Sequence, residues 1–221
     1  MRLFNLFKKK KQLEFFRDEK GKHQFGGDVP NDFHIPENNF LGGFQYLGTI
    51  SKEDQHLHWL PFDLNLICPI FTDFDALYLD YTDSNKPLII YPEDSENITS
   101  AYDEITRQSK IIYEQKRYST QWFEGINDDN EFEIFGITGK PQPNFDDEPV
   151  FYPSCPKSGK KMKFVAQLYG NKHIKYQSKN FKSSDDYYER LFQFMNFWGD
   201  GSLLIFIEPS SKVVYYSISN T

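Results

Sequence analysis

Hydrophobic and polar residues follow one another in short runs along most of this chain, as they do in β-strands. Such runs occupy residues 44–50, 64–71, 76–81, 87–92, 131–137, 162–170, 203–208 and 213–218. The polar turns TDSNK and PSSK each separate two of these runs. Because turns of this kind join neighbouring antiparallel strands, we expect two β-hairpins, one near residues 76–92 and one near 203–218.

Two other segments have apolar residues at helical spacing. In residues 97–118 the apolar stripe includes Ile98, Ile105 and Ile112. In residues 184–197, Ser184 precedes two aspartates, as a helix N-cap residue precedes a favourable first turn. We therefore predict two main helices in a chain that is otherwise rich in strands.

The order of the segments repeats along the chain. FQYLGTI is followed by LYLDYTDSNKPLIIY, and MKFVAQL by LLIFIEPSSKVVYY; a glycine-proline loop precedes each set, at residues 25–30 and 137–143. This predicts an α+β fold, an antiparallel, β-rich single domain built from an internal duplication. Its parts are a basic and apolar N-terminal tail (1–16) and one domain (17–221), which contains half one (about 24–92), a linking helix (97–118) and half two (about 131–218).

Composition restricts the classes of function. The chain has 221 residues, of which 18% are aromatic, and a formal net charge of -7. This charge argues against a general nucleic-acid binder and suits a basic protein partner. Two cysteines cannot make a disulfide scaffold, so we expect a reducing compartment, the cytoplasm. No apolar run is long enough to span a bilayer, and residues 1–16 either touch a membrane surface weakly or pack on the domain.

The segment PSCPKSGKK (153–161) resembles the first half of a zinc knuckle. A structural zinc site needs four ligands, usually in closely spaced pairs. Cys68, His56 and His58 are the other candidates for a shared site with Cys155, and their spacing does not provide such pairs. No nucleophile, phosphate-loop or metalloprotease motif occurs either. We therefore expect no metal, no cofactor and no catalytic residues.

A second arrangement of charge leaves an alternative open. Eight lysines lie between Lys157 and Lys182, and aromatic residues alternate with them. Such a strip can follow a single-stranded nucleic acid by stacking and phosphate contacts. Because the chain is acidic overall and poor in arginine, we favour the explanation that this strip neutralises the acidic segments beside it.

Several short motifs resemble those of the YwqG-like family, a bacterial domain of unknown function. They are Gly26, Gly27 and Pro30, the strand Phe164–Leu168, and the turn WGDG (198–201) that leads into Leu203–Phe206. The resemblance implies an α+β domain with internal duplication and a role as an immunity protein in a bacterial toxin system. Relatives carry a second cysteine after Cys-Pro-x, where this chain has Ser158, and this difference weakens any inherited metal site.

We therefore expect a non-enzymatic cytoplasmic protein that binds another protein, such as a toxin. Nucleic-acid binding through residues 157–182 and an uncharacterised enzymatic activity are the alternatives. Carboxylates are expected to steer a basic partner, and tryptophans to anchor it. The candidate binding residues are Asp73, Asp75, Asp80, Asp83, Asp128, Asp129, Trp122, Trp198 and Asp200.

Overall fold

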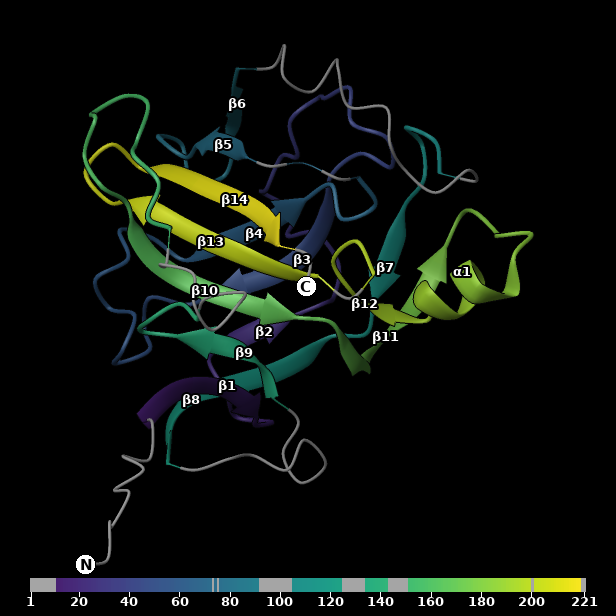
Figure 1. The fold of residues 1–221 in the computed structure, drawn as a ribbon, viewed down its shortest axis with the longest axis horizontal. Coiled ribbons are helices and arrows are strands. Elements are labelled where there is room, and N and C mark those ends of the chain that lie inside the picture. The colour runs from purple at the N-terminus through teal and green to yellow at the C-terminus, as the bar shows by residue number, and fades with distance from the viewer. Residues whose placement is uncertain are drawn as a thin grey trace, which may run out of the picture.

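The structure is a computed structural model that describes residues 11–72, 74, 76–91, 105–124, 134–142, 151–199 and 201–219. In these residues nearly all regular structure is antiparallel β-sheet (Figure 1). The larger sheet has the strand order β4 (Leu64–Cys68), β3 (Gln45–Ile50), β2 (His23–Phe25), β8 (Lys116–Glu124), β1 (Lys11–Arg17), β9 (Ile134–Thr138), β10 (Lys163–Tyr169), β13 (Ser202–Glu208), β14 (Val213–Ser219), β5 (Leu77–Asp80) and β6 (Leu88–Ile90).

A smaller sheet and one short helix stand together beside the larger sheet (Figure 1). The smaller sheet has the order β12 (Phe194–Met195), β11 (Asn171–Lys179) and β7 (Ile111–Tyr113). Helix α1 (Asp186–Leu191) begins after Asp185, whose carboxylate accepts a hydrogen bond from the Tyr187 N–H. No helix in the described part of the chain is long and apolar enough to cross a membrane.

The prediction of an α+β fold with two main helices is wrong. Residues 111–113 and 116–118, placed in the helix 97–118, belong to strands β7 and β8, and residues 97–104 of that helix lie outside the described residues. In residues 111–113 burial alternates, which is the strand period and not the helical one. The second helix ends at Leu191, because Phe194 and Met195 pair with β11.

The larger sheet curls so that its two ends enclose the main core. Strands β10, β13 and β14 cross in front of β3 and β4 (Figure 1), and side chains from both layers form one buried cluster. Tyr81 and Tyr216 help to hold the layers together. The Tyr81 hydroxyl donates to the Asn65 carbonyl of β4 at 2.8 Å and lies 3.3 Å from the Tyr216 hydroxyl. Burial raises the pKa of both tyrosines, so both hydroxyls stay protonated.

Residues 11–16, placed in the N-terminal tail by the sequence, belong to the sheet. Strand β1 pairs with β8 on one side and β9 on the other. Its side chains Leu13 and Phe15 are buried, and Phe15 is part of the main core. Residues 1–10, which hold most of the predicted membrane contact, lie outside the described residues.

One pattern of strand pairing occurs twice along the chain, with boundaries that differ from those of the predicted halves. Strands β3 and β10 each pair with the strand that follows them in the larger sheet, β4 and β13, in the same register and with a bulge at the same place. The pairs that flank this bulge are Tyr46–Ile67 and Gly48–Leu66 in one half, and Phe164–Phe206 and Ala166–Ile205 in the other. By this register LLIFIE corresponds to β4. The repeat in the sequence had predicted that it corresponds to LYLDY, in β5.

The first strand of each half pairs within the other half. Strand β8, which precedes β9 and β10, pairs with β2, whereas β1, which precedes β2 and β3, pairs with β9. The two exchanged strands then pair with each other at the middle of the shared order β4-β3-β2-β8-β1-β9-β10-β13. A glycine with positive φ ends the second strand of each half, Gly26 after β2 and Gly139 after β9.

Candidate protein-binding surface

The outer face of strands β10, β13, β14, β5 and β6 carries a row of large side chains. Since successive side chains of a strand point to opposite faces, those between the core residues point outward. The cross-strand row is Phe164, Phe206, Tyr215, Tyr78 and Ile90. The second buried cluster contains Phe164, Phe206 and Tyr215, and Tyr78 and Ile90 pack against it.

Three further aromatic rings lie over this row and remain exposed. Phe151 lies 6.4 Å from Tyr215, Tyr152 lies 5.8 Å from Phe206, and Tyr91 lies 6.5 Å from Tyr78, measured between ring centroids. Their exposed fractions are 66%, 38% and 44%. We call these six residues, namely Tyr78, Tyr91, Phe151, Tyr152, Phe206 and Tyr215, the aromatic face. Leu88, 63% exposed on the adjoining edge strand β6, extends its apolar area.

The turn at residues 153–161, called the knuckle below, follows directly after Phe151 and Tyr152. The Cys155 N–H donates to the Lys160 carbonyl at 2.8 Å, and the Gly159 N–H donates to the Cys155 carbonyl at 2.8 Å. The Met162 N–H closes the turn by donating to the Pro153 carbonyl at 2.9 Å. Gly159 adopts a φ of 70°, which favours glycine. Backbone hydrogen bonds thus hold this turn in its shape.

The thiol of Cys155 is buried among hydrogen-bond donors. Burial alone would raise the pKa of this thiol, but hydrogen bonds from Ser158, Ser211 and the backbone N–H groups of Lys157 and Ser158 lower it below its ordinary value. The Ser211 hydroxyl lies 3.2 Å from the sulfur. Ser158 and Ser211 therefore contact the sulfur from two different turns.

An ion pair ties the knuckle to strand β5. The Lys157 ammonium lies 2.5 Å from the Asp80 carboxylate. Burial would raise the pKa of Asp80, but hydrogen bonds from Lys157 and Thr82 lower it. Asp80 is directly opposite Leu88 in the pairing of β5 with β6. The pair therefore lies at the border of the aromatic face.

The four predicted binding residues that the structure describes do not form one site. Asp80 and Asp83 lie together near the aromatic face, Asp83 in the turn between β5 and β6. Trp122 lies on β8, 46% exposed, with the ammonium of Lys11 over its ring. Trp198 packs against the main core, so it is a poor candidate for an anchor. The remaining candidates lie outside the described residues: Asp73, Asp75, Asp128, Asp129 and Asp200.

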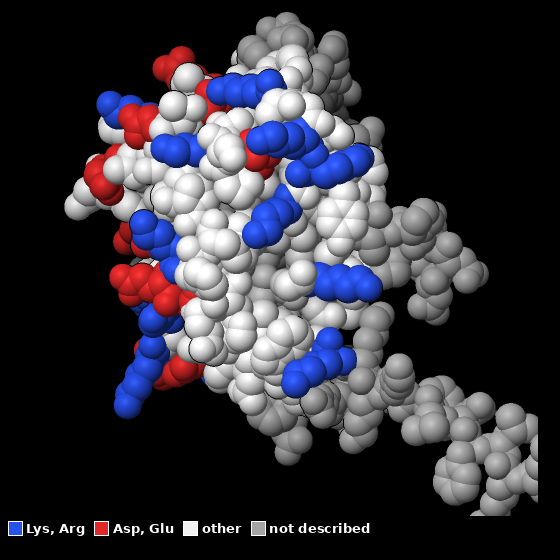
Figure 2. Space-filling model, turned by 90° about the vertical axis from the view of Figure 1, so that its left-hand side faces the viewer, with Lys and Arg blue, Asp and Glu red and all other residues white. Residues whose placement is uncertain are grey.

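The lysines of residues 157–182 fall into two groups. Lys157–Lys163 surround the knuckle and the start of β10, whereas Lys172–Lys182 belong to β11 and the segment that follows it. Between the groups, the side chains of residues 164–168 are buried. The Lys163 ammonium lies over the ring of Trp59, 3.9 Å from its centroid, and the Lys179 ammonium forms an ion pair with Glu189 at 2.6 Å. In Figure 2, basic side chains lie scattered over the middle of the face shown, between uncharged residues.

The four residues considered for a zinc site are not brought together. Cys68 is buried in the main core, whereas Cys155 belongs to the second cluster on the outer face. His56 and His58 lie in the turn-rich segment between β3 and β4. Among the described residues, no three His, Cys, Asp or Glu side chains are grouped so that they could hold a metal ion.

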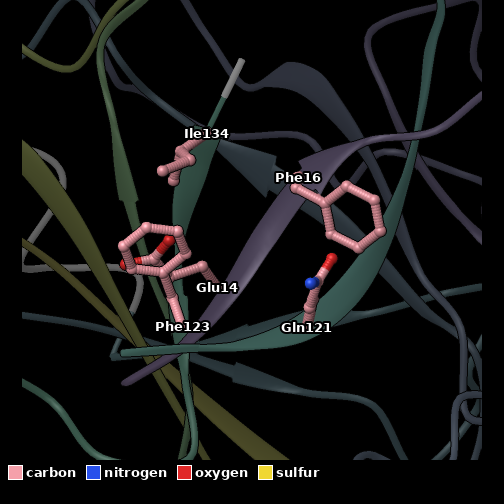
Figure 3. A pocket seen from close by; sticks show the side chains of 5 residues that line it. All are labelled: Glu14, Phe16, Gln121, Phe123 and Ile134. Carbon is pink, nitrogen blue, oxygen red and sulfur yellow. The ribbon is translucent and has the colours of Figure 1, made fainter. Parts of the chain in front are cut away.

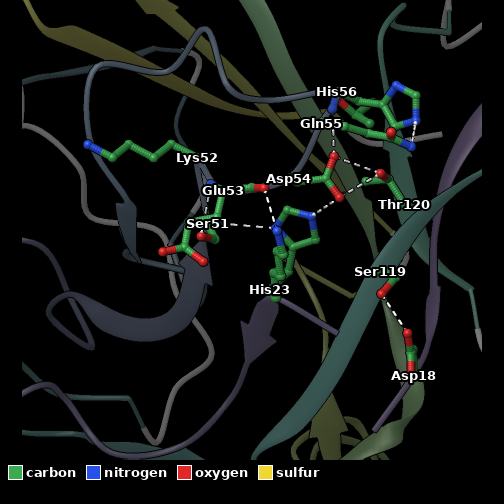
Figure 4. Close-up of polar contacts among 12 residues, drawn as sticks. Asp18, His23, Ser51, Lys52, Glu53, Asp54, Gln55, His56, Ser119 and Thr120 are labelled. Carbon is green, nitrogen blue, oxygen red and sulfur yellow. Dashed lines mark hydrogen bonds and ion pairs between the residues drawn. The ribbon is translucent and has the colours of Figure 1, made fainter. Parts of the chain in front are cut away.

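A buried polar cluster that the sequence did not reveal lies between β2, β8 and the segment after β3 (Figure 4). The Ser51 N–H donates to His23 Nδ1 at 3.1 Å, and His23 Nε2 lies 3.3 Å from Asp54 Oδ2, outside hydrogen-bond geometry. Asp54 also accepts hydrogen bonds from the Thr120 hydroxyl and the His56 N–H, both at 2.8 Å. Because His23 is completely buried, we assign this cluster a structural role.

The charge of Asp54 depends on these contacts. Burial would raise the pKa of Asp54, but the contacts with His23, the His56 N–H and the Thr120 hydroxyl lower it to about 2. The ionised carboxylate therefore fastens the segment after β3 to strands β2 and β8. This contact fixes one side of the sheet and lies apart from the aromatic face.

Comparisons with protein-family models, curated proteins and solved structures gave no match for this chain. The resemblance to the YwqG-like family therefore stays a prediction.

Proposed function

We propose that this protein is a non-enzymatic protein-binding module that recognises its partner through the aromatic face. The observation that carries the proposal is the set of exposed aromatic rings Tyr91, Phe151 and Tyr152, which stand on a buried aromatic layer. Tyrosine and phenylalanine are enriched in the cores of protein interfaces, and exposed apolar patches mark interaction sites. Rings held by packing below lose little conformational freedom when a partner covers them.

The charged side chains beside the aromatic face are placed as they are in the polar rim of a protein interface. Asp80, Lys157 and Asp83 lie near its border, and rim charges act mainly on the rate and specificity of association. A bacterial toxin is the partner class that the family resemblance implies, and in that case this protein would be its cytoplasmic immunity protein. The net charge of -7 favours a basic partner over an acidic one.

The experiment uses the full chain as tagged bait in a native lysate, with the salt concentration raised in steps. We expect one stoichiometric protein that survives moderate salt and that the double variant Phe151→Ala/Tyr152→Ala no longer captures. Tyr187→Ala is the matched control, because Tyr187 is 54% exposed on α1, away from the aromatic face. Equal capture by all three baits would contradict the proposal.

The immunity role has its own test. When the captured partner is expressed alone in a bacterial host, we expect growth to stop, and co-expression of this protein is expected to restore it. A partner that does not affect growth would remove the toxin from the proposal and leave protein binding in place.

A further inference from the structure

A small hollow lies on the outer face of strands β1, β8 and β9 (Figure 3). It has a volume of about 50 Å³ and is lined by Glu14, Phe16, Gln121, Phe123 and Ile134. It is separate from the aromatic face, although Glu14 and the outward residues of β10 and β13 lie on the same side of one sheet. Its volume suits the end of one side chain and not a whole small-molecule ligand.

The register of β1 and β8 determines how the hollow is built. Glu14 and Gln121 are direct cross-strand partners, so a carboxylate and an amide lie side by side in the middle. Phe123 belongs to the next outward pair on one side, and Phe16 to the next outward pair on the other. Figure 3 shows the Phe123 ring beside the Glu14 carboxylate and the Phe16 ring beside the Gln121 amide.

This arrangement matches the chemistry of a guanidinium group. Carboxylate and amide oxygens accept hydrogen bonds from its planar N–H donors, and aromatic faces attract its charge. A lysine ammonium carries the same charge, but it lacks the planar set of N–H donors that can bond a carboxylate and an amide oxygen together. The negative charge of Glu14 also acts on a neighbouring strand: burial chiefly, and then Glu14, raise the pKa of Tyr169 to about 12.

We infer that the hollow receives one arginine side chain of a partner protein. The inference is independent of the aromatic face, and it holds or fails whichever residues of that face bind. It does not require Glu14 to be free of contacts within the chain, since an arginine that replaces such a contact would only bind less tightly.

A direct test uses N-acetyl-arginine amide as the probe and the full chain labelled with ¹⁵N. We expect saturable shifts of the Gln121 and Phe123 amide signals. N-acetyl-citrulline amide has the same shape without the charge, and we expect it to bind roughly tenfold more weakly or worse. N-acetyl-lysine amide is expected to bind more weakly than the arginine probe.

Two variants check the assignment. Glu14→Gln removes the charge and keeps the shape, and we expect a loss of affinity of roughly tenfold for the arginine probe. Glu53→Gln, at an exposed position in the segment after β3, is the control and should bind as the unaltered protein does. Gln121→Leu removes the amide and should weaken binding less than Glu14→Gln does.

Three results would overturn the inference. The first is equal binding of the arginine and citrulline probes, and the second is unchanged binding by Glu14→Gln. The third is a shift of the Gln121 and Phe123 signals with protein concentration alone, which would mean that a second copy of this chain occupies the hollow. If the captured partner does not use the aromatic face but the arginine probe binds as expected, the proposed function fails and this inference stands.

Discussion

At the scale of single residues, Asp54 should make stability depend on pH. Its pKa is about 2 in the folded protein and 3.8 without perturbation. Because folding lowers this pKa, the stabilisation is complete above the unfolded value and disappears as the pH falls through 2. The difference corresponds to roughly 2 kcal/mol at pH 7.

Asp54→Asn tests this contribution by urea unfolding. We expect the free energy of unfolding to fall by roughly 2 kcal/mol at pH 7. The fall should be smaller at pH 3, where part of the stabilisation by ionised Asp54 is already lost. The gap between the unaltered protein and the variant should therefore narrow with acid. A gap that stays constant or widens between pH 7 and pH 3 would contradict the role given to this carboxylate.

Gly48 is a second position where a single residue should determine stability. Its φ is 135°, and a Cβ placed there would lie 2.1 Å from the Gln24 carbonyl oxygen of the neighbouring strand. Gly48→Ala should lower the free energy of unfolding by at least about 1–3 kcal/mol. Gly159→Ala, at a φ of 70° with no atom within 4 Å, should cost roughly 1 kcal/mol or less, as measured by thermal unfolding. Equal losses would show that the close strand contact is not important.

The binding residues were harder to predict than the special backbone positions. Gly26 and Gly27, in the glycine-proline loop at residues 25–30, both adopt a positive φ, as turn glycines do. Asp54 and His23 could not be recognised, because they are far apart in sequence and meet only when β2 pairs with β3, which leads into the segment of Asp54. Phe151 and Tyr152 lie in a proline-rich loop without periodicity, so no pattern indicated that they stack on the sheet.

At the scale of elements, strands with clear alternation were predicted well. The hairpins at residues 76–92 and 203–218 are confirmed as β5–β6 and β13–β14. The prediction of a helix at 97–118 was wrong because its apolar stripe counted Ile112, which is exposed. Ile111 and Tyr113 face the core instead, from a strand that pairs with β11. Long-range pairing of this kind overrides local propensity.

The ion pair between Lys157 and Asp80 should control the knuckle more than the whole protein. Both side chains are partly exposed, so Lys157→Ala should change the free energy of unfolding by less than about 1 kcal/mol. The amides of Cys155 and Gly159 should nevertheless exchange faster with deuterium, because the loop loses one of its ties to β5. Unchanged exchange in this loop would show that backbone hydrogen bonds alone hold it.

At the scale of the whole molecule, the exchange of β1 and β8 between the halves should make unfolding cooperative. The first strand of each half pairs with the second strand of the other half. Neither half can therefore unfold without breaking strand pairs of the other. We expect one urea transition that coincides for tryptophan fluorescence and far-ultraviolet circular dichroism. Two separated transitions, one for each half, would contradict the exchanged arrangement.

The central claim is that the aromatic face binds a partner protein, and the affinity of the captured partner for three forms of the chain tests it most directly. By calorimetry, Phe151→Ala should bind at least roughly tenfold more weakly than the unaltered protein, as truncation of an interface anchor does. Tyr187→Ala should bind with unchanged affinity. If Phe151→Ala binds as tightly as the unaltered protein, the partner uses another surface and the account is wrong.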